Sequence, residues 1–265
     1  MLFLFKIILT PVLVALVSIA ARRWGPTVAA LLIGFPWMTG PVLLFLGLEY
    51  GDTYIVRTAT GVLIGAVSIG FALLVFANVV KRASWPWALL SVFAAYGFAG
   101  YMLNNLQIPL WFAALLAVAS LVGASFLMPR PDVSIVPPQL PWWDIPMRMI
   151  ATALLVTIII VSADFLPPEL VGVVSSYPVI VTVVGAFTHA RWGWQPAVKL
   201  IRGVSLSLLS FVAFFLTLGA TIEHIGLIRA FMASALAGFF VSSSFVVFPH
   251  LRVKMRAFAS KQEKS

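Results

Sequence analysis

The sequence contains no cysteine and very few charged residues. Without cysteine the chain has no disulfide framework, no thiolate metal site and no cysteine nucleophile. Charged residues make up only 9% of the 265 residues, whereas a soluble domain carries about 25%. These charged residues are too few to cover a water-facing surface, which excludes an ordinary soluble enzyme and a disordered chain. The apolar runs are continuous instead of alternating, which excludes a transmembrane β-barrel.

In place of charge, the sequence has long apolar segments. Hydrophobic residues account for 62% of the chain, and the mean hydropathy is +1.08. A membrane span needs about 20 mainly apolar residues, and nine stretches qualify. The expected spans are Leu2–Ala20, Pro26–Leu48, Tyr54–Val80, Trp85–Leu103, Pro109–Met128, Pro146–Ala163, Pro168–Ala190, Ala197–Ile222 and Ile225–Phe248. We therefore predict an all-α polytopic membrane protein.

The basic residues indicate how these spans are oriented. If the N-terminus lies outside, all but three of the 17 basic residues fall in inside segments. The exceptions are Lys6, Arg57 and Arg229. By the positive-inside rule this predicts an outside N-terminus, a cytoplasmic C-terminus and a multi-pass location in a bacterial inner membrane. Orientation explains the positive net charge, so we do not expect nucleic acid as a partner.

Two proline-containing spans occupy equivalent places in the two halves of the chain. Gly34-Phe35-Pro36 lies in the second span and Ser176-Tyr177-Pro178 in the seventh, with the prolines 142 positions apart. At this offset the halves align without gaps, and Pro26 meets Pro168. Five spans precede the second copy. This odd number predicts that the second copy is inverted in the membrane, as in secondary transporters.

The repeat divides the chain into four parts. Residues 1–104 form the first four-helix repeat, and 105–143 form a linker helix with an interfacial loop. Residues 144–250 form the second, inverted four-helix repeat, and 251–265 form a basic cytoplasmic tail.

The two prolines also indicate a candidate binding site. A proline within a helix removes one hydrogen bond and clashes with the preceding turn. Free backbone groups at membrane depth need protein or a wet cavity around them. The candidate substrate-binding residues are Gly34, Phe35, Pro36, Thr39, Gly40, Ser175, Ser176, Tyr177, Pro178 and Thr182. The alternative is that both prolines only kink a helix for packing.

Four charged residues near helix ends are candidates for a gate or an interface. They are Glu49, Arg57, Arg191 and Lys199. Ordinary anchoring by snorkelling side chains is the alternative. The remaining ionisable groups also fall near helix ends, so we expect almost none in the deep core and no proton relay. The sequence has no catalytic motif and no ligand cluster, so we expect neither an enzyme, a metal nor a cofactor.

Each half resembles the GlpM family of small four-helix bacterial inner-membrane proteins. The resemblance rests on Phe-Pro or Tyr-Pro in the second helix of a half and on a following Gly51 or Gly193. A basic residue and a glycine then stand in the next helix (Arg57 and Gly61, Lys199 and Gly203). It implies two family copies fused through an extra helix, and a link to envelope metabolism.

From these observations we expect a transporter that moves a small polar or anionic organic solute by alternating access. Substrate would bind between the two proline-broken helices near the bilayer midplane. Two alternatives remain open. One is a flippase for a lipid-linked or amphipathic envelope precursor, and the other is a membrane scaffold for an envelope-biosynthesis complex that transports nothing. The lipid bilayer is the expected surrounding, and a homodimer is an open form of assembly.

Overall fold

The structure is a computed structural model that describes residues 2–24, 28, 32–37, 39–104, 106, 108–131, 141–163 and 177–262. Within these ranges the chain is helical and contains no strand. The helices are α1 (Leu2–Trp24), α3 (Thr39–Tyr50), α4 (Asp52–Val79), α5 (Trp85–Asn104), α6 (Leu110–Leu127), α7 (Asp144–Ala163), α9 (Val179–Trp192), α10 (Trp194–Ile225) and α11 (Leu227–Gln262). The predicted all-α class is therefore confirmed.

Five of these helices have the length and apolar composition needed to cross a membrane. Their apolar segments are Asp52–Val79, Trp85–Leu103, Leu110–Leu127, Trp194–Ile225 and Leu227–Phe245. Two shorter apolar helical segments, Ile8–Ala20 and Val179–Trp192, accompany them. Many of their large apolar side chains face outward, including Phe126 and Phe240, each 70% exposed. Such a surface suits lipid and not water, and it supports a multi-pass membrane protein.

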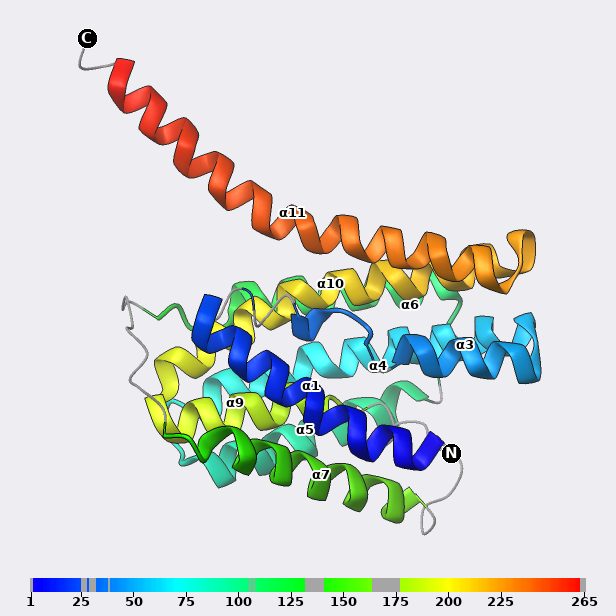
Figure 1. The fold of residues 1–265 in the computed structure, drawn as a ribbon, viewed down its shortest axis with the longest axis horizontal. Helices are drawn as coiled ribbons and strands as arrows, with labels where there is room; N and C mark the ends of the chain where they lie inside the picture. The colour runs from blue at the N-terminus through cyan, green and yellow to red at the C-terminus, as the bar shows by residue number, and fades with distance from the viewer. Residues whose placement is uncertain are drawn as a thin grey trace.

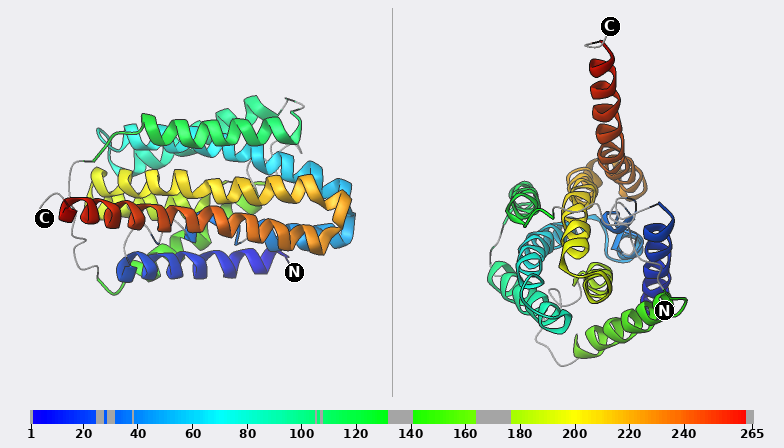
Figure 2. Two further views of the ribbon diagram at one scale, coloured as in Figure 1. Left: turned by 90° about the horizontal axis from the view of Figure 1, so that it is seen from above. Right: turned by 90° about the vertical axis from the view of Figure 1, so that its left-hand side faces the viewer.

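Helices α4 and α10 form the centre of the bundle. They pack against each other, α4 also packs against α5 and α6, and α10 also packs against α6, α9 and α11. Helices α1 and α7 lie side by side on one flank (Figure 1). Two further contacts, α3 with α11 and α5 with α9, join segments far apart in the sequence. Seen end-on, α10 lies among the other helices (Figure 2).

Two glycines set the starts of the central helices. Gly51 precedes α4 with φ 82° and ψ 177°, and Gly193 precedes α10 with φ 79° and ψ −175°. Glycine adopts this part of φ/ψ space because it has no Cβ atom. The two glycines are 142 positions apart, as are the first residues of α5 and α11. The offset in the sequence therefore recurs in the helix boundaries.

The helices run roughly along one axis, so their ends gather at the two ends of the bundle (Figure 1). The end of α1, the α4–α5 turn, the start of α7 and the α9–α10 junction share one end. The basic residues of these segments, among them Arg23, Lys81, Arg82 and Arg191, therefore make this end strongly positive.

The last helix is longer than the sequence predicts. We expected the final span to stop at Phe248 and a separate basic tail to follow, but α11 continues without interruption to Gln262. Its C-terminal part projects away from the bundle (Figure 1). Residues 251–262 contain mainly good helix formers such as arginine, lysine, alanine and methionine, which explains the continuation.

Candidate functional site

The first proline interrupts the helical backbone where the sequence predicts. Residues 32–34 are helical, 35–37 are not, and α3 begins at Thr39. Pro36 has no N–H for the carbonyl of Leu32, four residues earlier. The indole Nε1–H of Trp37 donates to this carbonyl at 2.8 Å instead. The break is therefore stabilised by the side chain that follows it.

The segment before Pro36 is held tightly against α10. The Ser210 hydroxyl donates to the carbonyl oxygen of Gly34 at 2.9 Å. A Cβ atom added at Gly34 would collide with the backbone carbonyl of Ser207. Glycine is thus required here because two backbones approach each other more closely than a side chain allows.

Aromatic rings surround the first break. The ring of Phe35 lies 4.8 Å from that of Trp37 and 6.4 Å from that of Phe214 on α10, measured between centroids. Its Cε2 atom lies 3.5 Å from the Cβ position of Gly238 on α11. The aromatic residue of the first break therefore packs against α10 and α11.

Tyr177 and Pro178 are not helical and directly precede α9. This segment, which we call the second break, packs against α5, and the residues before it lie outside the described part of the chain. The ring of Tyr177 stacks on Phe93 with centroids 4.5 Å apart and meets Tyr96 edge-on at 5.3 Å. The Thr182 hydroxyl is hydrogen-bonded to Tyr177 Oη at 2.9 Å and to the Pro178 carbonyl at 3.0 Å. This break therefore combines aromatic faces with two linked hydroxyls.

The two breaks share one backbone hydrogen-bond pattern. The N–H of Trp37 donates to the Phe35 carbonyl, and that of Val179 donates to the Tyr177 carbonyl, both at 2.9 Å. Likewise, the N–H of Gly40 donates to Pro36, and that of Thr182 to Pro178. Each donor and each acceptor has its counterpart 142 positions away. Gly238 and Tyr96, which receive the two aromatic rings, are also 142 apart.

The structure distributes the predicted binding residues over two places. Gly34, Phe35, Pro36 and Gly40 lie at the first break, with Thr39 at the start of α3. Tyr177, Pro178 and Thr182 lie at the second break, whereas Ser175 and Ser176 fall outside the described residues. In the described part of the chain, α3 and α9 do not pack extensively against each other. The breaks are thus matched in geometry and packed against different helices.

The four predicted gate or interface residues are all exposed. The Arg191 guanidinium lies 4.3 Å from the ring centroid of Trp143. This contact holds the guanidinium group beside the start of α7. Hydrogen bonding to Glu49 raises the pKa of the neighbouring Tyr50, so Glu49 has a partner of its own. Arg57 and Lys199 lie in the second turns of α4 and α10.

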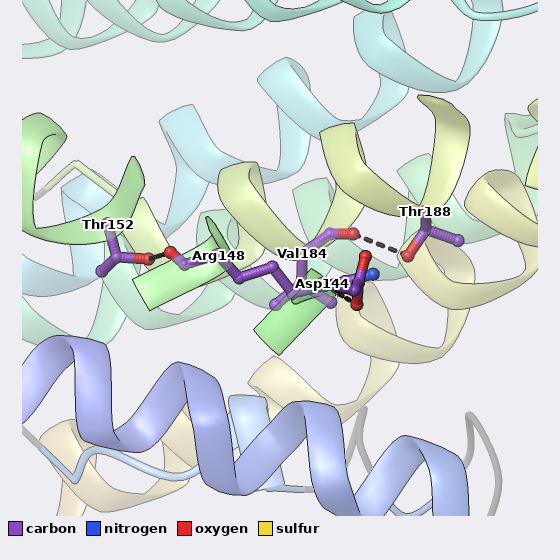
Figure 3. Close-up of polar contacts among 5 residues, drawn as sticks. All are labelled: Asp144, Arg148, Thr152, Val184 and Thr188. Carbon is purple, nitrogen blue, oxygen red and sulfur yellow. Dashed lines mark hydrogen bonds and ion pairs between the residues drawn. The ribbon is translucent and has the colours of Figure 1, made fainter. Parts of the chain in front are cut away.

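A buried ion pair at the start of α7 was not predicted from the sequence (Figure 3). Arg148 Nε donates to Asp144 Oδ2 at 2.9 Å, and the two residues are 3% and 0% exposed. The Arg148 guanidinium also lies 5.2 Å from the ring centroid of Phe187 on α9. The pair stands near a helix end, where the sequence predicts ionisable groups, but its burial was not expected. The aspartate-to-arginine spacing of four within one helix was the signal available.

The described residues include no cluster of three or more histidine, cysteine, aspartate or glutamate side chains that could hold a metal ion. The chemistry at the breaks instead comes from aromatic faces, hydroxyls and backbone carbonyls. Comparison with family models, with curated proteins and with solved structures finds no match to this chain.

Proposed function

We propose that the chain is a membrane transporter built from two inverted four-helix repeats. The first repeat comprises α1, α3, α4 and α5, and the second comprises α7, α9, α10 and α11, with α6 as the connector. Under this assignment the α1–α7 and α4–α10 contacts join equivalent helices. The α3–α11 and α5–α9 contacts each join the second helix of one repeat to the fourth helix of the other. This exchange of contacts is what a two-fold relation between the repeats requires.

One observation carries the proposal. Gly34 and Phe35 contact α10 and α11 of the second repeat, while Tyr177 contacts α5 of the first. Both breaks therefore lie where one repeat meets the other. Broken helices at a repeat interface are the usual place for substrate in transporters of this architecture. Movement of one repeat against the other would alter both breaks together.

The substrate we propose is a small polar or anionic organic solute. The first turns of α3 and α9 follow the breaks, and helix N-termini carry a partial positive charge that favours anionic groups. The basic end of the bundle is placed in the cytoplasm by the positive-inside rule.

A flippase for a lipid-linked or amphipathic envelope precursor is the second candidate. The observation that favours it is the aromatic surroundings of both breaks. Phe214 and Phe231 lie within 3.6 Å of the Cβ position of Gly40, and Phe93 and Tyr96 enclose Tyr177. Such surfaces suit the apolar part of an amphipathic molecule.

The test is transport by the purified chain in proteoliposomes. A panel of organic carboxylates and phosphate esters, together with one polyprenyl-phosphate-linked sugar, is first screened for an increase in melting temperature. Compounds that stabilise the protein are then followed across the membrane. We expect a stabilising solute to be taken up, and we expect the combined Pro36→Ala and Pro178→Ala variant to lose uptake.

Pro86→Ala is the matched control, because Pro86 is exposed in the first turn of α5, where proline costs no helical hydrogen bond. Movement of the lipid-linked sugar alone would assign the flippase. If no compound raises the melting temperature and none crosses the membrane, the result would favour the scaffold.

A further inference from the structure

A group of basic and aromatic side chains gathers where three parts of the chain meet at the positive end of the bundle. We call it the basic junction and define it by Lys81, Arg82, Trp143 and Arg191. Lys81 and Arg82 stand in the α4–α5 turn, Trp143 directly precedes α7, and Arg191 lies in the last turn of α9. Two contacts join the parts. His189 on α9 interacts with the backbone carbonyl of Val80, and the Arg191 guanidinium lies over the Trp143 ring.

The charge of the basic junction is not balanced by the acidic residue that the structure describes nearby. Asp144 is completely buried, and its carboxylate is bonded to Arg148. The side chains of Lys81, Arg82 and Arg191 are exposed. Three exposed cations thus face outward from one small region.

The depth of the basic junction relative to the apolar helices indicates its partner. Lys81 and Arg82 lie between two candidate membrane spans, the first ending at Val79 and the second beginning at Trp85. Exposed tryptophans flank the charges, with Trp87 64% and Trp142 83% exposed. Tryptophan rings beside basic residues at the ends of apolar spans are typical of the level of the lipid headgroups.

We propose that the basic junction binds the phosphate of an anionic phospholipid headgroup. Arg191, held by Trp143, supplies a planar donor for phosphate oxygens, and Lys81 and Arg82 supply further positive charge. An acidic soluble protein is a poorer fit, because the exposed tryptophans next to the charges belong at the membrane interface. The binding does not depend on transport, so it can be tested on its own.

The experiment uses the full-length purified chain in mild detergent, titrated with dioleoylphosphatidylglycerol or dioleoylphosphatidylcholine. Bound lipid is counted by native mass spectrometry, and the melting temperature is measured in parallel. We expect phosphatidylglycerol to bind more tightly and to stabilise the chain. The combined Lys81→Gln and Arg191→Gln variant should bind phosphatidylglycerol about 30-fold more weakly, since each basic residue near the surface contributes about 1 kcal/mol.

Two further variants separate the site from general charge. Arg57→Gln combined with Arg229→Gln removes the same charge from exposed residues at the other end of the bundle, and we expect unchanged binding. Trp143→Leu keeps every charge but frees Arg191, and it should weaken binding about two- to fivefold. Equal binding of the two lipids, equal losses in both double variants, or equal stabilisation by inorganic phosphate would each overturn the proposal. The melting temperature of each variant without lipid confirms that it is folded.

Discussion

At the scale of single residues, the closest approach described at the breaks is made by Gly34. Its Cα atom lies against the backbone of Ser207, so the contact cannot relax by rotating a side chain. Interiors packed in this way tolerate added methyl groups poorly. The glycine therefore determines how near the first break comes to α10.

Gly34→Ala should consequently destabilise the protein by about 1–3 kcal/mol, because the new methyl group pushes two backbones apart. The measurement is the melting temperature of the purified variant in detergent. Gly61→Ala is the control, since a Cβ atom at this exposed position of α4 meets no neighbour within 4 Å. An equal loss of stability in both variants would show that the contact with Ser207 is unimportant.

The sequence identifies the residues of the breaks but not their neighbours. A proline in an apolar span predicts the loss of helical hydrogen bonds at Pro36 and Pro178, and both backbones are non-helical there. The contact of Phe35 with α11 depends on how helices from both halves pack, which local patterns do not encode. The burial of Arg148 has the same origin, because Phe187 of α9 lies against its guanidinium group.

At the scale of helices, the two central elements begin in the same way. Gly51 and Gly193 hold φ near 80° with an extended ψ, a conformation that other residues reach only at a cost. Each glycine separates two helices that follow one another directly. The sharp change of direction into α4 and into α10 therefore depends on a residue without a Cβ atom.

Gly51→Ala and Gly193→Ala should each lower stability by about 1–3 kcal/mol, and by similar amounts if the two turns are equivalent. Thermal unfolding of the two variants gives the comparison. Gly97→Ala in α5 serves as reference, because a Cβ atom there meets nothing within 4 Å and alanine favours a helix. A strong effect at one turn and none at the other would contradict their equivalence.

At the scale of the whole molecule, the arrangement we propose places equivalent positions on opposite sides of the membrane. The first residues of α4 and α10, Asp52 and Trp194, lie 142 positions apart and occupy opposite ends of the bundle. The chain has no cysteine of its own, so single cysteines can report the side on which each position lies.

In whole cells, Asp52→Cys should react with a membrane-impermeant maleimide, whereas Trp194→Cys should react only after permeabilisation. The reason is that an odd number of spans separates the two positions in the inverted arrangement. The yield of labelled protein on a gel provides the measurement. Labelling of both cysteines from outside, or of neither, would exclude the inverted repeat.

The hydrogen bond between Ser210 and Gly34 spans 176 positions of the chain. During synthesis the carbonyl of Gly34 cannot receive this partner until residue 210 has left the ribosome. The first half of the protein is therefore made well before its own helical break can be completed. Folding of the first break must therefore be completed late. Helices α10 and α11 are synthesised last, and they cover Gly34 and Phe35, which were among the first residues to be made.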